Sequence, residues 1–226
     1  MPAKISDHKN TKPAPKILYI INHIDWFWSH RYDLAKAALD NGYEVFIATA
    51  NAEKDEALSK AGFHPVNLPD YKGGLLSPSV FPVILSIRKH IKEIEPDIVH
   101  AITIKYSFMT GLAGLFLKDS KSLFTIAGLG FLFSSTNRKA KLFKPFAKPI
   151  LKLALARPSV QMIFQNPDDL EEMAEAGLAR RQNSVVIPGS GVDLNKFSAS
   201  AEPDKKEAVV LMPTRLVKEK GVSYFV

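Results

Sequence analysis

Short, almost wholly apolar runs alternate with longer amphipathic stretches from residue 16 onward. The apolar runs are rich in β-branched and aromatic residues and occupy 17–21, 43–49, 64–68, 97–103, 122–127, 160–164 and 185–188. The stretches that repeat apolar residues with a helical period occupy 30–41, 53–61, 79–95, 106–117, 138–156 and 167–176. Strands that are apolar on both faces are typical of a parallel sheet covered by helices on both sides. The pattern therefore predicts an α/β fold with a doubly wound, Rossmann-like parallel sheet.

Several predicted helices have recognisable ends. Asn41-Gly42 predicts the end of the first helix, with Gly42 in the left-handed conformation common after a helix C-terminus. Asn166 precedes Pro167 and two acidic residues, a pattern typical of an N-cap and a first helical turn. Gly177 is expected to end that helix.

Composition changes at both ends of this alternating region. Residues 1–15 are polar and are expected to form a flexible leader. Residues 16–197 are the predicted Rossmann-like domain, and the small, polar and charged residues at 198–207 predict a linker. The run AVVLMP at 208–213 predicts a new buried strand, so residues 208–226 are expected to be the truncated start of a second α/β domain.

The overall composition narrows the possible functions. The 226 residues include no cysteine, which excludes disulfides, thiol nucleophiles and cysteine-based zinc sites. Thirty basic residues against 23 acidic ones leave a net charge of +7, which favours an anionic partner such as nucleic acid, phospholipid headgroups or a phosphorylated substrate. No stretch has the ~20 apolar residues of a membrane span, and the first apolar run lacks a signal-peptide cleavage site. We therefore expect a cytoplasmic protein.

One segment accounts for the whole charge surplus. Between Ser134 and Val160 there is no acidic residue, and the basic residues there are Arg138, Lys139, Lys141, Lys144, Lys148, Lys152 and Arg157. Leucine, isoleucine and phenylalanine are interleaved with them, as in amphipathic segments that dock on anionic membranes. An ordinary helix packed on the sheet is the alternative, but it does not explain the lack of acids. We expect the six basic residues from Arg138 to Lys152 to dock on the inner face of the cytoplasmic membrane.

Candidate ligand-binding residues follow the predicted strands, at the carboxyl edge where open α/β sheets bind ligands. WFWSHR at 26–31 follows the first strand. Ser29 is expected to cap the next helix, which would leave His30 and Arg31 beside free N–H groups suited to an anion or a sugar hydroxyl. The alternative is a hydrophobic plug in which the basic residues have no ligand.

The fourth and fifth strands add further candidates. His100 is either a ligand-binding residue or, as is commoner for a single histidine, a buried one with its hydrogen bonds satisfied. Lys105, expected at the edge of the crevice, is the better candidate for a charged ligand. Gly128 and Gly130 either permit close approach of a ligand to the backbone or simply form a tight turn.

Other features concern phosphates and cofactors. Arg215 and Lys220 are five positions apart and could converge on a diphosphate, because arginine supplies a planar fork and lysine a point charge. A charged surface loop is the alternative. The glycine pairs lack the third glycine of a dinucleotide fingerprint, which argues against a dehydrogenase. A P-loop and a helical metal-binding histidine pair are also missing.

Five motifs in a fixed order resemble family 4 glycosyltransferases of the GT-B fold. They are SHRYDLAKAALDNGYEVFIATA, PDIVHAITIKYSFMTGLAG, AGLGFLFS, VIPGSGVDLNKF and PTRLVKEKG, and the resemblance covers nearly the whole chain after residue 16. It implies two Rossmann-like domains facing a cleft, with the acceptor on the N-terminal domain and the nucleotide-sugar donor mostly on the C-terminal one. It also implies transfer with retention of anomeric configuration and without a bound metal.

The resemblance assigns roles to individual residues. Arg215 and Lys220 would be the catalytic pair that stabilises the departing diphosphate. Donor-side residues would be Gly189, Ser190 and Gly191. Acceptor-side residues would be Ser29, His30, Arg31, His100, Lys105, Gly128 and Gly130. Two departures are visible: the turn after the first strand is aromatic rather than glycine-rich, and Ile102 replaces the second histidine of the usual His-x-His.

The resemblance is strongest to bacterial enzymes that extend lipid-linked saccharides in surface polysaccharide or glycan biosynthesis. The expected partners are a nucleotide-sugar, a glycan or lipid-linked glycan, and an anionic membrane surface. We expect the 226-residue chain to be inactive by itself. The alternative is a non-enzymatic, acceptor- and membrane-binding half of a split GT-B enzyme. A nucleic-acid-binding module is suggested only by charge, since the basic residues lie among aliphatic rather than stacking aromatic ones, and no nucleic acid is expected as partner.

Overall fold

The computed structural model describes residues 13–73, 77–115, 117, 120–129, 148–201, 209–214, 216 and 220–225. The chain divides into two compact units, Met1–Gly191 and Val192–Val226. The boundaries predicted at residues 197 and 207 stay predictions.

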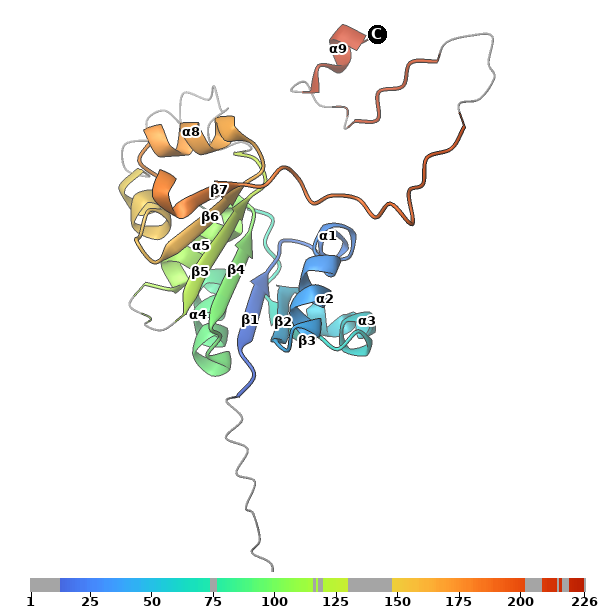
Figure 1. Cartoon of the computed structure of the whole chain (residues 1–226). Helices are drawn as coiled ribbons and strands as arrows, with labels where there is room; N and C mark the ends of the chain where they lie inside the picture. The colour runs from blue at the N-terminus through green and yellow to red at the C-terminus, as the bar shows by residue number, and fades with distance from the viewer. Residues whose placement is uncertain are drawn as a thin grey trace, which may run out of the picture. The chain divides into compact units, whose positions relative to one another are not determined.

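The first unit is built on one parallel sheet (Figure 1). Among the described residues it has seven strands, in the spatial order β3-β2-β1-β4-β5-β6-β7. Their bounds are β1 Lys16–Ile20, β2 Glu44–Ala50, β3 His64–Leu68, β4 Ile98–Ile102, β5 Lys121–Ile126, β6 Val160–Phe164 and β7 Ser184–Val186. Each of the first seven predicted apolar runs overlaps one of these strands, and all pairings are parallel. The predicted doubly wound α/β fold is therefore confirmed.

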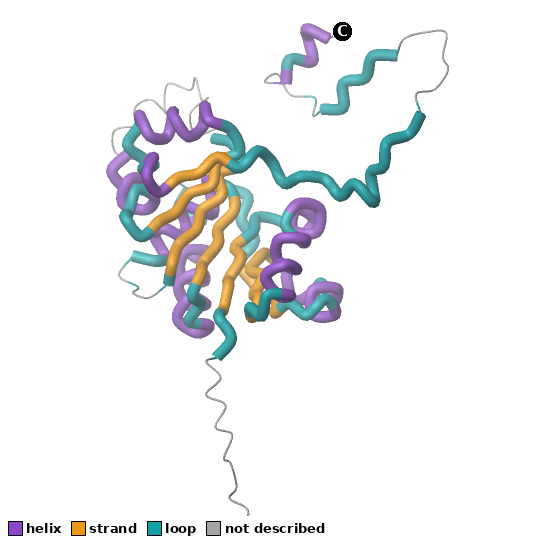
Figure 2. The backbone as a smooth tube through the Cα atoms, viewed as in Figure 1, coloured by secondary structure: helices purple, strands orange, loops and turns teal. Residues whose placement is uncertain are grey.

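Helices lie on both faces of the sheet (Figure 2). The helical elements are α1 Ile24–His30, α2 Tyr32–Asp40, η1 Ala52–Lys54, α3 Glu56–Lys60, α4 Val80–Ile94, α5 Ile104–Ala113, residues 148–155, α8 Pro167–Glu175 and η2 Arg181–Asn183. Successive β1 side chains belong to different cores: Leu18 and Ile20 pack with α4 and α5, whereas Tyr19 and Ile21 pack with α1–α3. This alternation buries both faces of the sheet and explains why its strands are mostly apolar.

Predicted helix ends are largely confirmed. Asn166 is the N-cap of α8, where its side chain accepts a 2.7 Å hydrogen bond from the backbone N–H of Asp169. Gly177 follows the end of α8 with φ of 69°, and Gly42 follows α2 with φ of 83°. Both glycines have the left-handed backbone that terminates a helix without strain.

The helix predicted at 30–41 is wrong at its start, because two helices occupy this region. His23 caps α1 by accepting a hydrogen bond from the N–H of Asp25, so helix begins six residues earlier than predicted. Ser29 lies inside α1 and donates from Oγ to the backbone oxygen of Asp25, at 2.6 Å. The N-cap of α2 is Arg31, whose side chain makes no capping bond. The capping role expected for Ser29 is therefore corrected.

The second unit contains the short helix α9, Val222–Phe225. The strand predicted at 208–213 is not found at residues 209–213, and Val209, Val210 and Leu211 are each more than 70% exposed. A strand needs a neighbour to satisfy its backbone groups, and the described part of this unit supplies none. An apolar run alone was therefore insufficient to predict a buried strand. Across the described residues, no helix is long and apolar enough to cross a membrane.

Candidate functional site

A cleft of about 270 Å³ opens at the carboxyl ends of the central strands. It lies where the chain, after β1, β2 and β3, returns to place β4 on the other side of β1. Connections that diverge from such a point leave a crevice, the usual ligand site of open α/β sheets. The residues that line it are Ile21, Asn22, Trp26, His30, Arg31, Ile102, Thr103, Ala127, Gln165 and Ser190.

Among the ten described residues that line the cleft, Arg31 is the only arginine or lysine. It occupies the junction of α1 and α2, where its φ of −129° interrupts the helical path. Burial lowers the pKa of its guanidinium, and the nearby Tyr19 hydroxyl acts in the opposite direction. None of the ten lining residues is acidic. The cleft therefore presents a positive group to a ligand.

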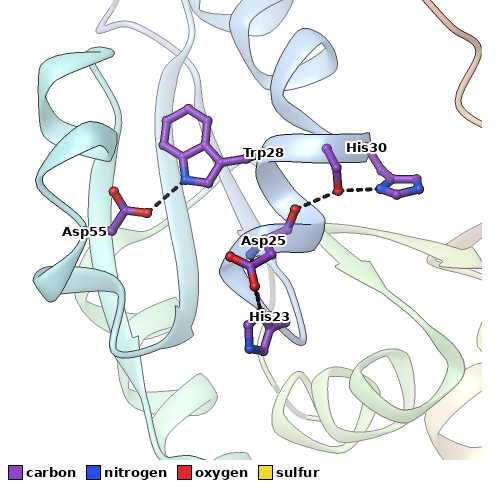
Figure 3. A network of polar contacts seen from close by, with 6 residues as sticks. His23, Asp25, Trp28, His30 and Asp55 are labelled. Carbon is purple, nitrogen blue, oxygen red and sulfur yellow. Dashed lines mark hydrogen bonds and ion pairs between the residues drawn. The ribbon is translucent and has the colours of Figure 1, made fainter.

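An aromatic pair lies beside this arginine. The rings of Trp26 and His30 are 4.9 Å apart between centroids, and the Trp26 side chain is 54% exposed. His30 Nδ1 lies 2.6 Å from the Ser29 hydroxyl (Figure 3). Because Ser29 donates its single proton to Asp25, Nδ1 must donate to Ser29, which leaves Nε2 of a neutral His30 as an acceptor. The pair offers an apolar face and a hydrogen-bond acceptor.

Helix α1 is held in place from its other side. Trp28 Nε1 donates a 2.8 Å hydrogen bond to Asp55 Oδ2, a residue 27 positions later in the chain (Figure 3). The second oxygen of Asp55 accepts from the N–H of Ala57 and thereby caps α3. One carboxylate thus links two helices and restrains the helix that carries Trp26 and His30.

Thr103, which follows β4 and lines the cleft, has an unusual backbone. Its φ of 79° and ψ of 149° fall in a region that only glycine adopts readily. Its N–H donates to the backbone oxygen of Thr125 at 2.9 Å, so the conformation is anchored to β5. Strain of this kind accumulates at ligand sites.

His100 belongs to the core beneath the cleft. It is 2% exposed, its Nε2 lies 2.8 Å from Thr125 Oγ1, and its ring packs against Tyr19. Burial, assisted by the positive charge of Arg31, lowers the pKa of His100 to about 3, so the ring is neutral at pH 7. The buried, satisfied alternative describes this histidine, and its placement on the acceptor side is corrected, because it cannot touch an acceptor from the core.

Lys105 is also engaged by the protein. Its ammonium donates to the backbone oxygen of Gly73 at 2.9 Å and lies 5.2 Å from the centre of the Tyr71 ring. These contacts tie α5 to the loop after β3, and Lys105 is not among the lining residues. Its expected role toward a charged ligand stays a prediction.

Three of the candidate glycines have backbones with positive φ. Gly128 has φ of 121°, and Gly189 and Gly191 have φ of 68° and 73° on either side of Ser190, which lines the cleft. A side chain at Gly189 or Gly191 would meet no atom within 4 Å, so their need for glycine is conformational rather than steric.

The remaining predicted residues lie elsewhere. Lys220 is exposed in the second unit. Lys148 and Lys152 are exposed on the helix at 148–155. The candidates outside the described residues are Gly130, Arg215, Arg138, Lys139, Lys141 and Lys144.

Sequence reasoning missed Asn22, Thr103 and Gln165 as parts of the site. Each follows a strand at its carboxyl end, a positional signal that could have identified all three. In the described part of the chain, no group of three or more histidine, aspartate or glutamate side chains is arranged to hold a metal ion.

Comparison with known proteins identifies relatives of this chain. The family model described as "Glycosyl transferase 4-like" matches residues 16–166. The fold resembles a glycosyltransferase from Rickettsia africae, with a TM-score of 0.56, 18% identity, and coverage of 83% of this chain and 46% of that one. It also resembles HepE from Anabaena, solved with UDP and glucose, with a TM-score of 0.53, 16% identity, and coverage of 82% and 47%.

A third similar structure is MnaA from S. aureus with UDP, with a TM-score of 0.53, 17% identity, and coverage of 85% of this chain and 50% of that one. The chain thus spans about half the length of these proteins. No curated protein matches it. At these identities the solved structures establish the fold, and the family model, which covers more than half of the chain, establishes its membership. The chain belongs to the glycosyl transferase 4-like family.

Proposed function

We propose that this chain is the acceptor-binding part of a glycosyltransferase that moves a sugar from a nucleotide-sugar to a saccharide. The observation that carries the proposal is the cleft at the carboxyl ends of β1, β4, β5 and β6, in a chain of a glycosyltransferase family. Its lining combines an exposed indole, two side-chain amides and two hydroxyls, which are the groups that bind the faces and hydroxyls of a sugar.

Several residues of the cleft would together orient the acceptor. Asn22, Gln165 and Ser190 would hydrogen-bond to sugar hydroxyls, and Trp26 would lie against the ring. His30 Nε2 would accept a hydrogen bond from one further hydroxyl. Holding the acceptor hydroxyl in line with the donor lowers the activation barrier by removing the entropic cost of finding that geometry.

The donor would be bound mainly by residues of the second unit. HepE and MnaA were solved with UDP, which supports a nucleotide-sugar as donor. Arg215 and Lys220 would stabilise the charge that develops on the departing diphosphate. Gly189, Ser190 and Gly191 would be donor-side residues of the first unit. The proposed reaction retains the anomeric configuration and uses no metal and no bound cofactor.

The direct test is a transfer assay with the full-length protein that contains this chain. Radiolabelled nucleotide-sugars would be incubated with lipid and glycan extracts in the presence of EDTA. Label transferred to a saccharide, with the configuration retained by NMR, is the expected result. Conversion of the nucleotide-sugar without transfer, or transfer only with an added metal, would contradict this part of the proposal.

Variants of the donor side complete the assay. Arg215→Ala and Lys220→Ala should each lower kcat about 10²–10³-fold, as expected for loss of a preorganised donor to developing charge. Lys196→Ala, also in the second unit, is the matched control and should leave kcat unchanged. If transfer occurs only after a separate polypeptide is added, the result would favour the alternative that this chain is the non-enzymatic half of a split enzyme.

The proposed acceptor is lipid-linked and the proposed location is the cytoplasmic face of the membrane, as suits surface polysaccharide or glycan synthesis in bacteria. Support comes from the helix at 148–155, where Lys148, Ile150, Lys152 and Leu153 are all exposed. Exposed lysines beside exposed aliphatic residues are typical of helices at an anionic membrane surface.

Vesicle sedimentation tests this location. The protein should bind vesicles that contain anionic lipid at low salt and release at high salt, because each lysine near such a surface contributes about 1 kcal/mol and salt screens it. Lys148→Gln/Lys152→Gln should weaken binding, and Lys89→Gln/Lys92→Gln on α4 should not. Equal binding to neutral vesicles would contradict electrostatic docking.

A further inference from the structure

Arg31 differs from every other arginine that the structure describes. Arg88, Arg157 and Arg180 donate hydrogen bonds to backbone oxygens, and Arg181 pairs with Glu171. The guanidinium of Arg31 makes no hydrogen bond and no ion pair within the described residues, although it lies partly buried in the cleft. An arginine that is partly desolvated and unpaired is costly for the protein to keep.

The surroundings of Arg31 do not neutralise its charge. The charge of Arg31 acts to lower the pKa values of two nearby titratable groups, Tyr19 and His100. Tyr19, whose pKa burial raises to about 12, and His100, whose pKa is about 3, are both uncharged at pH 7. Since the lining also contains no acid, a negative counterpart must come from outside the described chain.

The size and shape of the cleft limit what that counterpart is. Its volume of about 270 Å³ lies just below the ~300–1,000 Å³ typical of ligand pockets, which suits one sugar ring better than a whole nucleotide-sugar. The exposed Trp26 indole beside Arg31 provides a flat apolar surface for the C–H face of such a ring. The planar guanidinium fork matches the two oxygens of a carboxylate or a phosphate.

We infer that the acceptor sugar bound in this cleft is anionic, with its carboxylate or phosphate on the Arg31 guanidinium and its ring against Trp26. This inference rests on the proposed function and deepens it, because it assigns the acceptor a charge. Arg31 is then a specificity-determining residue that favours acidic sugars and sugar phosphates over neutral ones.

Intrinsic fluorescence can test the inference on the 226-residue chain. The sequence has two tryptophans, and one of them, Trp26, lines the cleft. Glucuronate, glucose 1-phosphate, glucose and UDP would each be titrated, since the first two separate the carboxylate from the phosphate. Arg31→Gln removes the charge, Arg31→Lys keeps it without the fork, and Arg180→Gln is a matched charge control on the exposed surface. Trp26→Phe identifies the signal of the cleft.

At least one of the two anionic sugars should bind ten-fold or more tightly than glucose. Arg31→Gln should reduce that preference to two-fold or less, Arg31→Lys should retain part of it, and Arg180→Gln should retain all of it. Glucose binding as tightly as both anionic sugars, or a preference that survives Arg31→Gln, would overturn the inference while leaving a saccharide site. If Arg31→Gln weakens the binding of UDP but of neither anionic sugar, the inference is overturned, and Arg31 would be a donor-binding residue instead. If the fluorescence of Trp26 changes with none of the sugars, charged or neutral, the proposed acceptor site is overturned as well.

Discussion

Thr103 shows how a single residue at the cleft stores strain. A β-branched residue at φ of 79° and ψ of 149° carries a conformational cost of about 1–3 kcal/mol, which the bond to Thr125 and the start of α5 must offset. Thr103 directly follows β4 and lines the cleft. We interpret the strain as part of how the site is shaped.

Thr103→Gly should therefore raise the free energy of unfolding by about 1 kcal/mol, because relief of strain exceeds the added entropy of the unfolded chain. Thr103→Ala is the control, since it removes the hydroxyl but keeps the Cβ and hence the strain. Urea denaturation measures both. An equal effect of the two substitutions would show that the backbone conformation is not strained.

His100 makes stability depend on pH. Its pKa is about 3 in the folded protein against an ordinary value of 6.5, so the unfolded chain takes up a proton first as the pH falls. Its contribution to stability is complete above pH 6.5 and should decline by roughly 1 kcal/mol per pH unit between 6.5 and 3.

Urea denaturation at pH 7, 6, 5 and 4 measures this dependence. His100→Gln, which keeps a hydrogen-bonding side chain, should show a shallower loss, whereas His64→Gln, at an exposed site, should match the wild type. Identical pH profiles for the wild type and His100→Gln would mean that His100 is not buried in its neutral form.

At the scale of elements, Asp55 joins α1 to α3, because its carboxylate accepts one hydrogen bond from Trp28 and one from Ala57. Asp55→Ala should lower the free energy of unfolding by about 1–2 kcal/mol, since it removes a helix cap and leaves the Trp28 N–H without its partner. Asp55→Asn can keep the cap and should lose less. Chemical denaturation distinguishes the two, and equal losses would indicate that the bond to Trp28 is the dominant one.

Helix α5 packs closely on the helix at 148–155 through a glycine. A Cβ at Gly111 would lie 2.3 Å from the backbone oxygen of Ala154, too close for the two helices to keep their positions. Gly111→Ala should lower the free energy of unfolding by about 1–3 kcal/mol through overpacking.

Gly114→Ala provides the comparison for this contact, because its closest contacts would be at 3.3 Å and 3.4 Å, to Thr110 and Arg157. A smaller loss of stability is expected there, measured by the same denaturation. Equal stability of Gly111→Ala and the wild type would mean that the helices are not in contact at this point.

The strands were predictable because each falls in a short, mostly apolar run, a pattern imposed by burial on both faces. Helix α1 was not predictable from the sequence. Its N-cap is a histidine, and its aromatic residues Trp26, Phe27 and Trp28 are also compatible with a loop that packs on the core. Ser29 looked like a cap, but its hydroxyl bonds to Asp25 one turn back. Local chemistry therefore indicated a helix start in the right region and at the wrong residue.

Across the whole molecule, the location of the site followed from topology alone. Residues after parallel strands meet at one edge, so His30 and Arg31 could be placed at the cleft before any coordinates. What each side chain does there depends on tertiary contacts. Lys105 donates to Gly73, His100 is buried against Tyr19, and Arg31 makes no hydrogen bond or ion pair with the residues that the structure describes. No sequence pattern distinguishes the contacts that these three side chains make.

The central claim is that the cleft at the carboxyl ends of β1, β4, β5 and β6 binds a saccharide, and NMR mapping tests it most directly. The amides of the ¹⁵N-labelled chain would be followed during titration with glucose and glucose 1-phosphate. The account predicts shifts concentrated at residues 21–31, 102–103, 127, 165 and 190. Shifts concentrated at the amino ends of the strands, or the absence of any shift at the cleft, would contradict it.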